Sequence, residues 1–536
     1  MPSLKESELQ DVQNNLSELA QKTNEYHEGK INIKDYKGFS GHYGTFSQRG
    51  GKSNMLRLRM NAGELDKKKM KFIVDFINTH KTGPIHSATC QTVQIHDLDP
   101  EEVVAEIKEA LEAGIITYGT GGDYPRNIMC SPLAGVDPNE VFDVSPYAKK
   151  AAEYLVETIE DPLMPRKMKT AFSGGDFCNT HATYRDLGFV ARANGTFDVF
   201  AAGGLGPNPR FGVKVAENVA PEDVLYYIRA MINTFKKYGD NKDKRKARTR
   251  YMVEALGGED AFRNAYLTEL EKVLPDPSLK ITEVEEKNIT KTGNGSKAPD
   301  DWRVIAQKQD GLYAVRYHAP GGCPDHQVFT KLYETIEPMD QVELRTSPEQ
   351  TFFIINLNGK EAKAVIDVID EDSARNPFES SVSCIGAARC QVGLRDSQEL
   401  LRTLIREVRA AQIKDGALPQ IHVSGCPSSC GAHQTGRIGI RGTVKVINRK
   451  VVPAFTLFID GCDTQDASQM GTEIGSMPEE VIDDFIVDLG KTVSASGMSY
   501  DEWHQKDPDA LKEIAQKYMF EEEQAEKAEA AAPVKK

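Results

Sequence analysis

Four cysteines form two short pairs whose spacing suits a metal centre. Cys384 and Cys390 are separated by five residues and Cys426 and Cys430 by three, with thirty-five residues between the pairs. Both pairs lie among small residues, in CIGAARC and GCPSSCGAH. Small residues let a bulky cluster approach the backbone and receive amide hydrogen bonds on its sulfurs. Four thiolates suit either an iron–sulfur cluster or a zinc ion.

The spacing favours the cluster over the ion. Structural zinc loops usually place their ligands closer together than Cys384 and Cys390 are. Pro427 directly follows Cys426, a pairing typical of bacterial ferredoxins. We therefore predict a [4Fe–4S] cluster, with zinc and unligated core cysteines as the open alternatives. The remaining cysteines are scattered singly and receive no role: Cys90, Cys130, Cys178, Cys323 and Cys462.

The composition is that of a globular protein with a large core. The chain has 536 residues, of which 39% are hydrophobic and 27% charged, and this length predicts roughly three to four domain-sized units. A net charge of −14 argues against general binding to nucleic acid or acidic membranes. No apolar run approaches the ~20 residues of a membrane helix, and the N-terminus has no apolar signal core, so we expect a cytoplasmic protein without a disulfide framework.

One basic run stands out against the acidic background. It could be a solvated helix face, a docking patch for an acidic electron donor, or a set of anchors for an anionic cofactor. The run comprises Lys236, Lys242, Lys244, Arg245, Lys246, Arg248 and Arg250.

The chain resembles itself. A strand, a helix, two strands and a helix between Met55 and Ala113 recur in the same order between Leu312 and Asp370. Residues 172–192 correspond to 423–442, and residues 197–206 to 455–464. A coincidence is the alternative, but the shared order of the matched segments argues against it. In the first copy Ser and Thr stand where most of the paired cysteines stand in the second. We also expect a helix over 398–411 with Ser397 as its N-cap.

The cysteine pattern and the duplication resemble the sirohaem-dependent sulfite and nitrite reductase family, over roughly residues 35–515. The resemblance implies an α+β fold with pseudo-twofold symmetry, in which two ferredoxin-like halves and two larger α+β reductase domains clasp a sirohaem and a [4Fe–4S] cluster. The implied segments are a helical arm (1–37), a first ferredoxin-like half (38–118), a first reductase domain (119–285), a linker (286–300), a second ferredoxin-like half (301–372), a second reductase domain with the cluster (373–516) and a charged tail (517–536).

The resemblance also implies roles for individual residues. The four paired cysteines would ligate the cluster, and the thiolate of Cys430 would bridge it to the sirohaem iron. A substrate oxyanion needs electrostatic pull and protons as its oxygens leave, and ordinary surface cations are the alternative reading of the residues assigned to this task. The predicted catalytic cations around the distal face of the sirohaem are Arg57, Arg126, Lys167 and Lys169.

Two further residues match sirohaem contacts, Arg166 and Gln94. The sequence departs from the family at Thr89-Cys90, where sulfite reductases often have Arg, so one carboxylate contact must be supplied differently. The run Gly203–Gly206 lacks dinucleotide-binding spacing and is interpreted as a loop near the cofactor. His433, beside the second cysteine pair, is interpreted as a structural hydrogen-bonding residue and not as a catalyst.

Lys169 favours sulfite as the substrate, because the nitrite reductases of the family resemble R-K-x-N where this chain has R-K-x-K. Ferredoxin-dependent reduction of nitrite to ammonia is the close alternative, and a non-catalytic zinc or iron–sulfur protein the remote one. No flavin or nicotinamide segment is recognisable. We therefore expect electrons from a separate ferredoxin or flavoprotein, docking near Lys236–Arg250.

Overall fold

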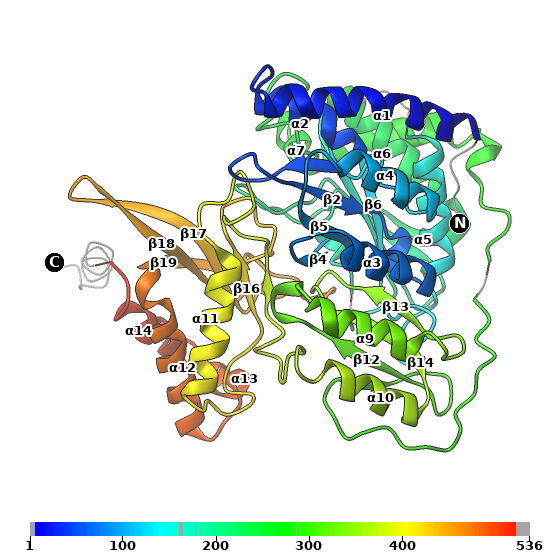
Figure 1. Ribbon diagram of the computed structural model, residues 1–536. Helices are drawn as coiled ribbons and strands as arrows, with labels where there is room; N and C mark the ends of the chain where they lie inside the picture. The colour runs from blue at the N-terminus through cyan, green and yellow to red at the C-terminus, as the bar shows by residue number, and fades with distance from the viewer. Residues whose placement is uncertain (1–5, 160–163, 178, 286, 521–536) are drawn as a thin grey trace.

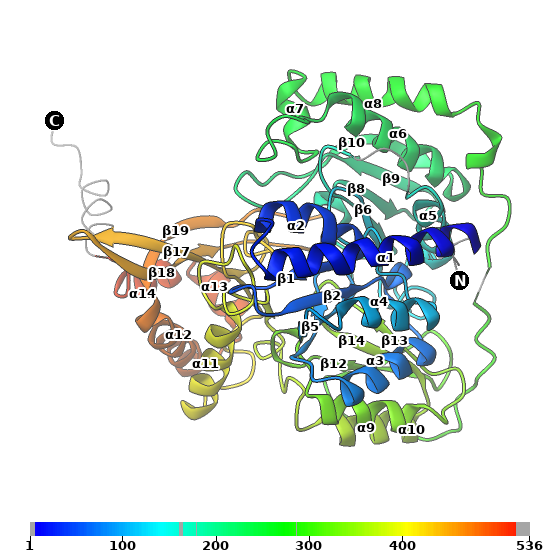
Figure 2. The same cartoon turned by 45° about the horizontal axis from the view of Figure 1, so that its top comes forward.

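The computed structural model describes residues 6–159, 164–177, 179–285 and 287–520. Its strands form four sheets, two in each half of the chain. The last sheet and the helices that follow it form a domain to one side of a larger body built from the rest of the chain (Figure 1). In Figure 2, helices α6–α8 lie at one end of that body and α9 and α10 at the other, with the sheets between them.

The first ferredoxin-like half is an antiparallel sheet covered by helices. Its strands, in the order β1-β2-β5-β4, are β1 (Thr45–Ser47), β2 (Asn54–Leu58), β5 (Thr92–Leu98) and β4 (Ile85–Ala88). Its helices are α1 (Glu6–His27), α2 (Ile33–Ser40), α3 (Lys67–Thr79) and α4 (Val103–Glu112). Helix α3 begins where the Asp66 side chain accepts a hydrogen bond from the Lys69 amide, and its apolar face is buried.

The second ferredoxin-like half repeats this plan and shares a core with the first. Its sheet has the order β11-β12-β14-β13-β3, with β11 (Val304–Ala306), β12 (Tyr313–Tyr317), β14 (Phe352–Leu357) and β13 (Glu343–Thr346). The edge strand β3 (Glu64–Leu65) comes from the first half of the chain. Helices α9 (His326–Ile336) and α10 (Gly359–Ile369) cover the sheet, and α9 packs against α3. One hydrophobic cluster contains residues of both halves, which therefore form one unit.

Each of the two reductase domains has its own five-stranded sheet, and both sheets follow the same plan. Three parallel strands are followed by two antiparallel ones. The first contains β6 (Pro125–Cys130), β7 (Met168–Ser173), β8 (Leu187–Ala191), β9 (Phe197–Ala201), β10 (Val213–Val219), α5 (Ser145–Glu157), α6 (Val224–Tyr238), α7 (Tyr251–Ala255) and α8 (Glu259–Val273). The second contains β15 (Val382–Ser383), β16 (Ile421–Ser424), β17 (Ile438–Ile447), β18 (Lys450–Ile459), β19 (Thr472–Pro478), α11 (Ser397–Ala410), α12 (Ile482–Ser496), α13 (Tyr500–Lys506) and α14 (Ala510–Gln516).

Short 3-10 turns complete the described chain: η1 (Gly41–Tyr43), η2 (Asn61–Gly63), η3 (Ala182–Tyr184), η4 (Pro221–Asp223), η5 (Pro277–Leu279), η6 (Pro320–Gly322) and η7 (Glu479–Val481). Between η5 and β11 the described residues carry no helix or strand. Of the expected charged tail, residues 521–536 lie outside the described part. None of the described helices combines the length and the apolarity needed to cross a lipid bilayer.

Two glutamines show the duplication in detail. Gln91 and Gln350 each have a positive φ, of 53° and 65°, in the turn between two strands of a ferredoxin-like half. The Gln91 amide donates to the Cys130 carbonyl and accepts from the Cys130 amide, both at 2.8 Å. Gln350 does the same with Ser383, at 2.7 and 2.8 Å. Each glutamine thus fixes the strand from which a reductase domain continues, and the predicted duplicated α+β architecture is confirmed.

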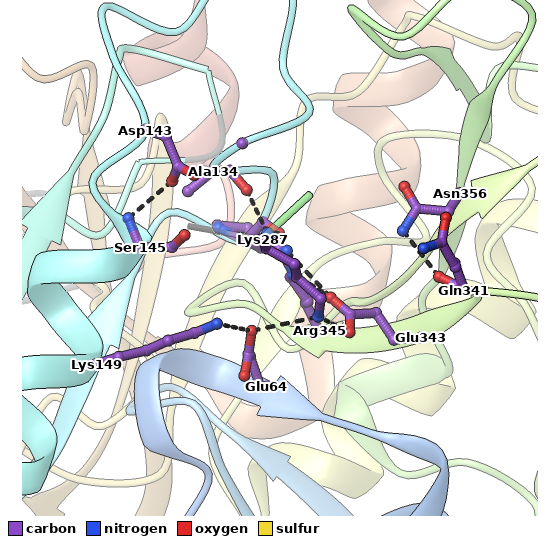
Figure 3. A network of polar contacts seen from close by, with 12 residues as sticks. Glu64, Ala134, Asp143, Ser145, Lys149, Lys287, Gln341, Glu343, Arg345 and Asn356 are labelled. Carbon is purple, nitrogen blue, oxygen red and sulfur yellow. Dashed lines mark hydrogen bonds and ion pairs between the residues drawn. The ribbon is translucent and has the colours of Figure 1, made fainter. Parts of the chain in front are cut away.

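A buried charge network joins the two halves of the chain (Figure 3). Arg345 on β13 contacts Glu343 at 3.1 Å, and Lys149 of α5 contacts Glu64 of β3 at 2.7 Å. Lys287 lies between the two carboxylates and pairs with both. Burial opposes the charge on Glu64, but Arg345, Lys287 and Lys149 outweigh it and lower the pKa of Glu64 to about 2. The network is therefore ionised at neutral pH and fixes how the halves pack.

Candidate active site

The two cysteine pairs meet at one edge of the last sheet. Cys384 follows β15 and Cys426 follows β16, and these strands are parallel, so their carboxyl ends share an edge. The Gly425 amide donates to Cys384 Sγ at 3.2 Å. A side chain at position 425 would come within 2.5 Å of a backbone carbonyl, so the approach requires glycine. Burial, together with the nearby Cys430, raises the pKa of Cys384 to about 12.

Ser397 supports this cysteine and does not cap the following helix. The N-cap of α11 is Asp396, whose side chain accepts hydrogen bonds from the amides of Gln398 and Glu399, so the predicted cap was wrong by one residue. The Ser397 hydroxyl lies 2.8 Å from the Cys384 carbonyl oxygen and 3.1 Å from its Sγ. A carboxylate is as good a cap as a hydroxyl, which leaves the serine free for the cysteine.

The first cysteine loop is held by the first ferredoxin-like half. Arg49 donates to the carbonyl of Cys390 at 3.2 Å, and its own amide donates to the carbonyl of Arg389 at 2.9 Å. The Arg389 guanidinium forms a bidentate pair with Asp97, with its closest contact at 2.7 Å. A Cβ at Gly83 would lie 2.1 Å from the Asp97 carboxylate, so this glycine makes room for the pair. The loop is thus positioned before any cofactor is added.

Cys430 is the exposed member of the four and faces the cationic residues. Its carbonyl accepts a hydrogen bond from Thr89 at 2.9 Å. Burial and the neighbouring Arg126, Lys169 and Arg248 lower the pKa of Lys167, and Cys430 opposes them. Lys167 therefore lies close to both the thiol and the other cations.

The predicted catalytic cations come from three strands and converge. Arg57 on β2 and Arg126 on β6 both donate to the carbonyl of Thr120, at 2.8 and 2.6 Å. Burial is the main cause that lowers the pKa of each of these arginines, and Arg57 contributes to the shift at Arg126. Lys169 is the second residue of β7, and Lys167 directly precedes the strand. The mutual influences on their pKa values show that these four side chains form one cationic cluster beside Cys90 and Cys430, and their catalytic roles remain predictions.

The predicted sirohaem contacts lie at different depths. Gln94 is buried, and its amide satisfies its neighbours when the oxygen accepts from Arg57 Nε and Nη2 at 3.1 and 3.0 Å and the nitrogen faces His96 at 3.2 Å. Arg166 is 40% exposed and pairs with Asp123 at 2.9 Å. Gln94 therefore orients Arg57, one of the predicted catalytic cations, whereas Arg166 lies nearer the surface.

The basic run near residue 245 divides into two groups. Arg248 turns inward, pairs with the fully buried Asp186 at 2.8 Å and contributes to the lowered pKa values of Arg126 and Lys167. Its place beside Arg126 and Lys167 was missed, since the sequence run alone does not show which side chains turn inward. The exposed members are Lys242, Lys244, Arg245 and Lys246.

Arg250 also turns inward, against the glycine run. Among the described residues neither its Nε nor its Nη1 has a partner, although the side chain is 6% exposed. A Cβ at Gly204 would lie 3.3 Å from Nη1 and one at Gly206 3.1 Å from Nη2, so the glycines leave the guanidinium its space. The Gly206 position also faces the carbonyl of Pro427 in the second cysteine loop. An unpaired buried guanidinium is costly and suits a carboxylate from a bound ligand.

Cys90 places a thiol with a lowered pKa among the cations. Burial opposes its ionisation, but Lys169, Arg185 and Lys167 outweigh it and lower the pKa of Cys90 to about 6. Lys169 is close enough to hydrogen-bond the sulfur. The departure from the family at Thr89-Cys90 thus puts a thiol with a lowered pKa beside Lys169, the residue on which the expectation of sulfite rests.

His433 does not act as the expected hydrogen-bonding residue. It is fully buried, and neither ring nitrogen has a partner among the described residues. Its ring packs against Phe458 with the centroids 4.9 Å apart. Burial, Arg441 and His422 lower its pKa to about 3, so it is neutral and acts as a packing residue.

Comparison with known proteins agrees with this geometry. Residues 46–114 match the nitrite/sulfite reductase ferredoxin-like half domain, and residues 121–274 match the nitrite and sulphite reductase 4Fe-4S domain. The ferredoxin–nitrite reductase of Spinacia oleracea chloroplasts is 26% identical over 447 residues, which cover 78% of this chain and 70% of the relative. The assimilatory ferredoxin-dependent nitrite reductase of Haloferax mediterranei is 24% identical over 513 residues, covering 88% and 86%.

A solved structure extends the likeness to nearly the whole chain. Mycobacterium tuberculosis NirA superposes with a TM-score of 0.74 at 21% identity, over 90% of this chain and 92% of that one. At this identity the likeness establishes the fold. Together with the matched domains, it makes the chain similar to nitrite and sulfite reductases over most of its length. The protein is an oxidoreductase, and its cofactors are a sirohaem and a [4Fe–4S] cluster.

The residues present fit both cofactors. Tetrahedral zinc would hold thiolate sulfurs about 3.8 Å apart, but no three cysteine sulfurs of the described chain lie within 4.8 Å of one another. The described cysteines are therefore not gathered as tightly as a tetrahedral zinc ion requires, and zinc is set aside. Cys178 lies outside the described residues. The unpaired atoms of Arg250 and the cations around Cys430 suit the carboxylates of a sirohaem.

Proposed function

We propose that this enzyme reduces nitrite to ammonia with six electrons that ferredoxin supplies one at a time. Bound sirohaem and cluster supply the multi-electron redox chemistry. The curated relatives reported above are ferredoxin-dependent nitrite reductases, and they support nitrite over the sulfite that the sequence favoured. The protein's own residues bind the anion, hold it near Cys430 and deliver protons.

The pairing of Lys169 with Cys90 is the observation that carries this preference. Lys169 was the reason to expect sulfite, since an added cation favours a dianion over a monoanion. With the pKa of Cys90 lowered to about 6, the thiolate offsets that cation at neutral pH. Cys90 and Lys169 together then contribute about the same net charge as a neutral residue at position 169 would. We propose that this lower positive charge suits the monoanion nitrite.

Lys167 is the best candidate for the proton donor. Its pKa lies well below the usual value, mainly because of burial and then because Arg126, Lys169 and Arg248 repel its charge. A cation that gives up its proton readily can protonate a substrate oxygen as it leaves as water. Arg57 and Arg126 keep their charges and hold the anion.

Sulfite reduction remains the second candidate, favoured by the presence of a lysine at position 169. The electron donor docks, in this proposal, on the exposed part of the basic run at residues 242–246. The cytoplasmic location stays a prediction of the sequence.

The decisive experiment compares kcat/KM for nitrite and sulfite with a reduced dye in three proteins: wild type, Cys90→Ser and Lys169→Asn. We expect the wild type to prefer nitrite. Cys90→Ser frees the charge of Lys169 and should raise the relative kcat/KM for sulfite about five-fold, which corresponds to ~1 kcal/mol. Lys169→Asn should lower it. A wild-type preference for sulfite would transfer the assignment to the second candidate.

A further inference from the structure

A cluster of potential metal ligands lies apart from the cysteine loops. His181, Glu349 and Asp463 each place one ligand atom within 4.8 Å of the others, and His181 Nε2 lies 2.7 Å from Glu349 Oε1. The three residues come from the loop before η3, the β13–β14 turn and the loop after β18. The cluster thus joins the first reductase domain, the second ferredoxin-like half and the second reductase domain.

A second imidazole, His422 of β16, lies near the cluster but outside the group of three ligand atoms. It is 4% exposed, and its Nδ1 lies 3.2 Å from the Ala432 carbonyl oxygen. A carbonyl only accepts, so Nδ1 carries the proton and Nε2 keeps its lone pair. Metal-binding histidines commonly have this arrangement, in which a backbone carbonyl fixes the tautomer. Asp463, His181 and Glu349 all lie near enough to influence the pKa of His422.

The two carboxylates have no permanent cationic partner. Within the described part of the chain, no lysine or arginine pairs with Glu349 or Asp463, and the ion pair of Glu349 is with His181. The His181 side chain is 6% exposed, and its Nδ1 has no partner among the described residues. Neighbouring carboxylates with a partly satisfied buried imidazole are unfavourable unless a cation joins them.

The cluster lies at a position of the duplicated fold that is equivalent to the position of Cys90 in the other half. Glu349 directly precedes Gln350, just as Cys90 directly precedes Gln91, and the two glutamines occupy equivalent turns. Cys90 is surrounded by lysines and arginines. At the equivalent position, Glu349 is surrounded by imidazoles and a carboxylate. The two equivalent turns therefore differ in charge. The turn at Cys90 is surrounded by cations and attracts anions, whereas the turn at Glu349 carries carboxylates and attracts cations.

We propose that His181, Glu349 and Asp463 bind a divalent transition-metal ion, with zinc as the ion that fits them best. One imidazole and two carboxylates are ligands that zinc accepts, and a water molecule can take the fourth tetrahedral position. The ion joins three segments that are distant in the sequence, so its role is structural.

The test uses the holoenzyme, dialysed against a chelator and then titrated with zinc chloride by calorimetry. Zinc per chain is measured by elemental analysis after gel filtration, and visible spectra check that the sirohaem and cluster are retained. The wild type should hold one zinc per chain and melt at a higher temperature with zinc than without it. Glu349→Gln and Asp463→Asn should each bind this zinc at least ten-fold more weakly and lose the zinc-dependent rise.

Two control variants guard against binding elsewhere. His504 and Asp460 form a lone histidine–carboxylate pair at 2.6 Å, so Asp460→Asn should keep the zinc. His80, with Glu102 and Glu106, forms the other ligand group found in the described chain, and His80→Asn should also keep it. A wild type that takes up no zinc overturns the proposal. So does a zinc that disappears in His80→Asn and persists in both Glu349→Gln and Asp463→Asn. If Glu349→Gln does not fold, the wild-type titration and Asp463→Asn still decide the question.

Discussion

The cysteine loops of the second reductase domain have close counterparts in the first, and the two differ in one atom at a key position. The Gly425 amide donates to the sulfur of Cys384 at 3.2 Å, and the Gly174 amide donates to the hydroxyl of Ser131 at 2.9 Å. In both places a glycine amide donates to the side chain that follows the first strand of the parallel set. The duplicated scaffold therefore supplies the geometry, and the side chain decides whether a cluster can be ligated there.

The second loop shows the same relation. The Gly431 amide donates to Ser424, and the Thr180 amide donates to Ser173, both at 3.1 Å. Cys430 directly precedes the glycine, and Asn179 directly precedes the threonine. The Asn179 side chain accepts from the His181 amide at 2.7 Å and donates to the Asp463 carbonyl at 3.2 Å. In the first half this position closes the loop with hydrogen bonds, whereas in the second it offers a free thiol.

The strongest test of this difference is Cys430→Ser. We expect dye-driven nitrite reduction to fall by at least about 10³-fold, because the variant would lose the thiolate that is proposed to hold the cluster beside the sirohaem. The matched control is Cys130→Ser, since the equivalent position in the other half is naturally Ser383. That variant should keep most of its activity. Equal losses in the two variants would mean that the halves do not differ in the way described.

The next test concerns the cations, which the first half supplies. Because the protonated form of Lys167 is the proposed acid and its pKa is lowered by burial and by its cationic neighbours, kcat should fall as pH rises through a value well below the usual lysine range. Lys167→Met should lower kcat by about 10²- to 10⁴-fold. Lys167→Arg stays charged, so its pH profile should lose the alkaline fall. An unchanged alkaline fall in Lys167→Arg would assign it to another group.

A smaller effect is expected at the surface. Lys242→Glu combined with Lys246→Glu should raise the KM for ferredoxin about ten-fold at low salt and less at high salt, because exposed charges are screened. Dye-driven turnover should not change. Lys491→Glu, an exposed lysine of α12 in the other half, is the matched control. The same KM in the double variant and the wild type would place the docking surface elsewhere.

The sequence predicted what depends on spacing and repetition, and missed what depends on long-range contacts. The cysteine spacing and the repeated segments follow from ligand geometry and gene duplication, and both survive in a single sequence. The inward turn of Arg248 depends on Asp186, sixty-two positions away. The partnership of Cys90 with Lys169 likewise joins a turn of the first ferredoxin-like half to a strand of the first reductase domain. The N-cap of α11 was displaced by one residue because aspartate and serine are adjacent and both cap well.

The finest test compares two serines that begin equivalent helices. Ser397 at the start of α11 contacts Cys384 Sγ at 3.1 Å. Ser145 stands at the start of the equivalent helix α5, and in that half Ser131 occupies the position of Cys384. Ser397→Ala removes a hydroxyl next to a cluster sulfur, so it should make the cluster potential more negative by some tens of millivolts, on the order expected for one hydrogen bond. Ser145→Ala removes a hydroxyl that makes no cap hydrogen bond, so it should leave both the potential and the unfolding temperature close to the wild-type values. Redox titration followed by electron paramagnetic resonance measures the first quantity and thermal unfolding the second. If both variants shift the potential equally, the effect is transmitted through packing and not through the sulfur, and the two halves are less independent than their side chains indicate.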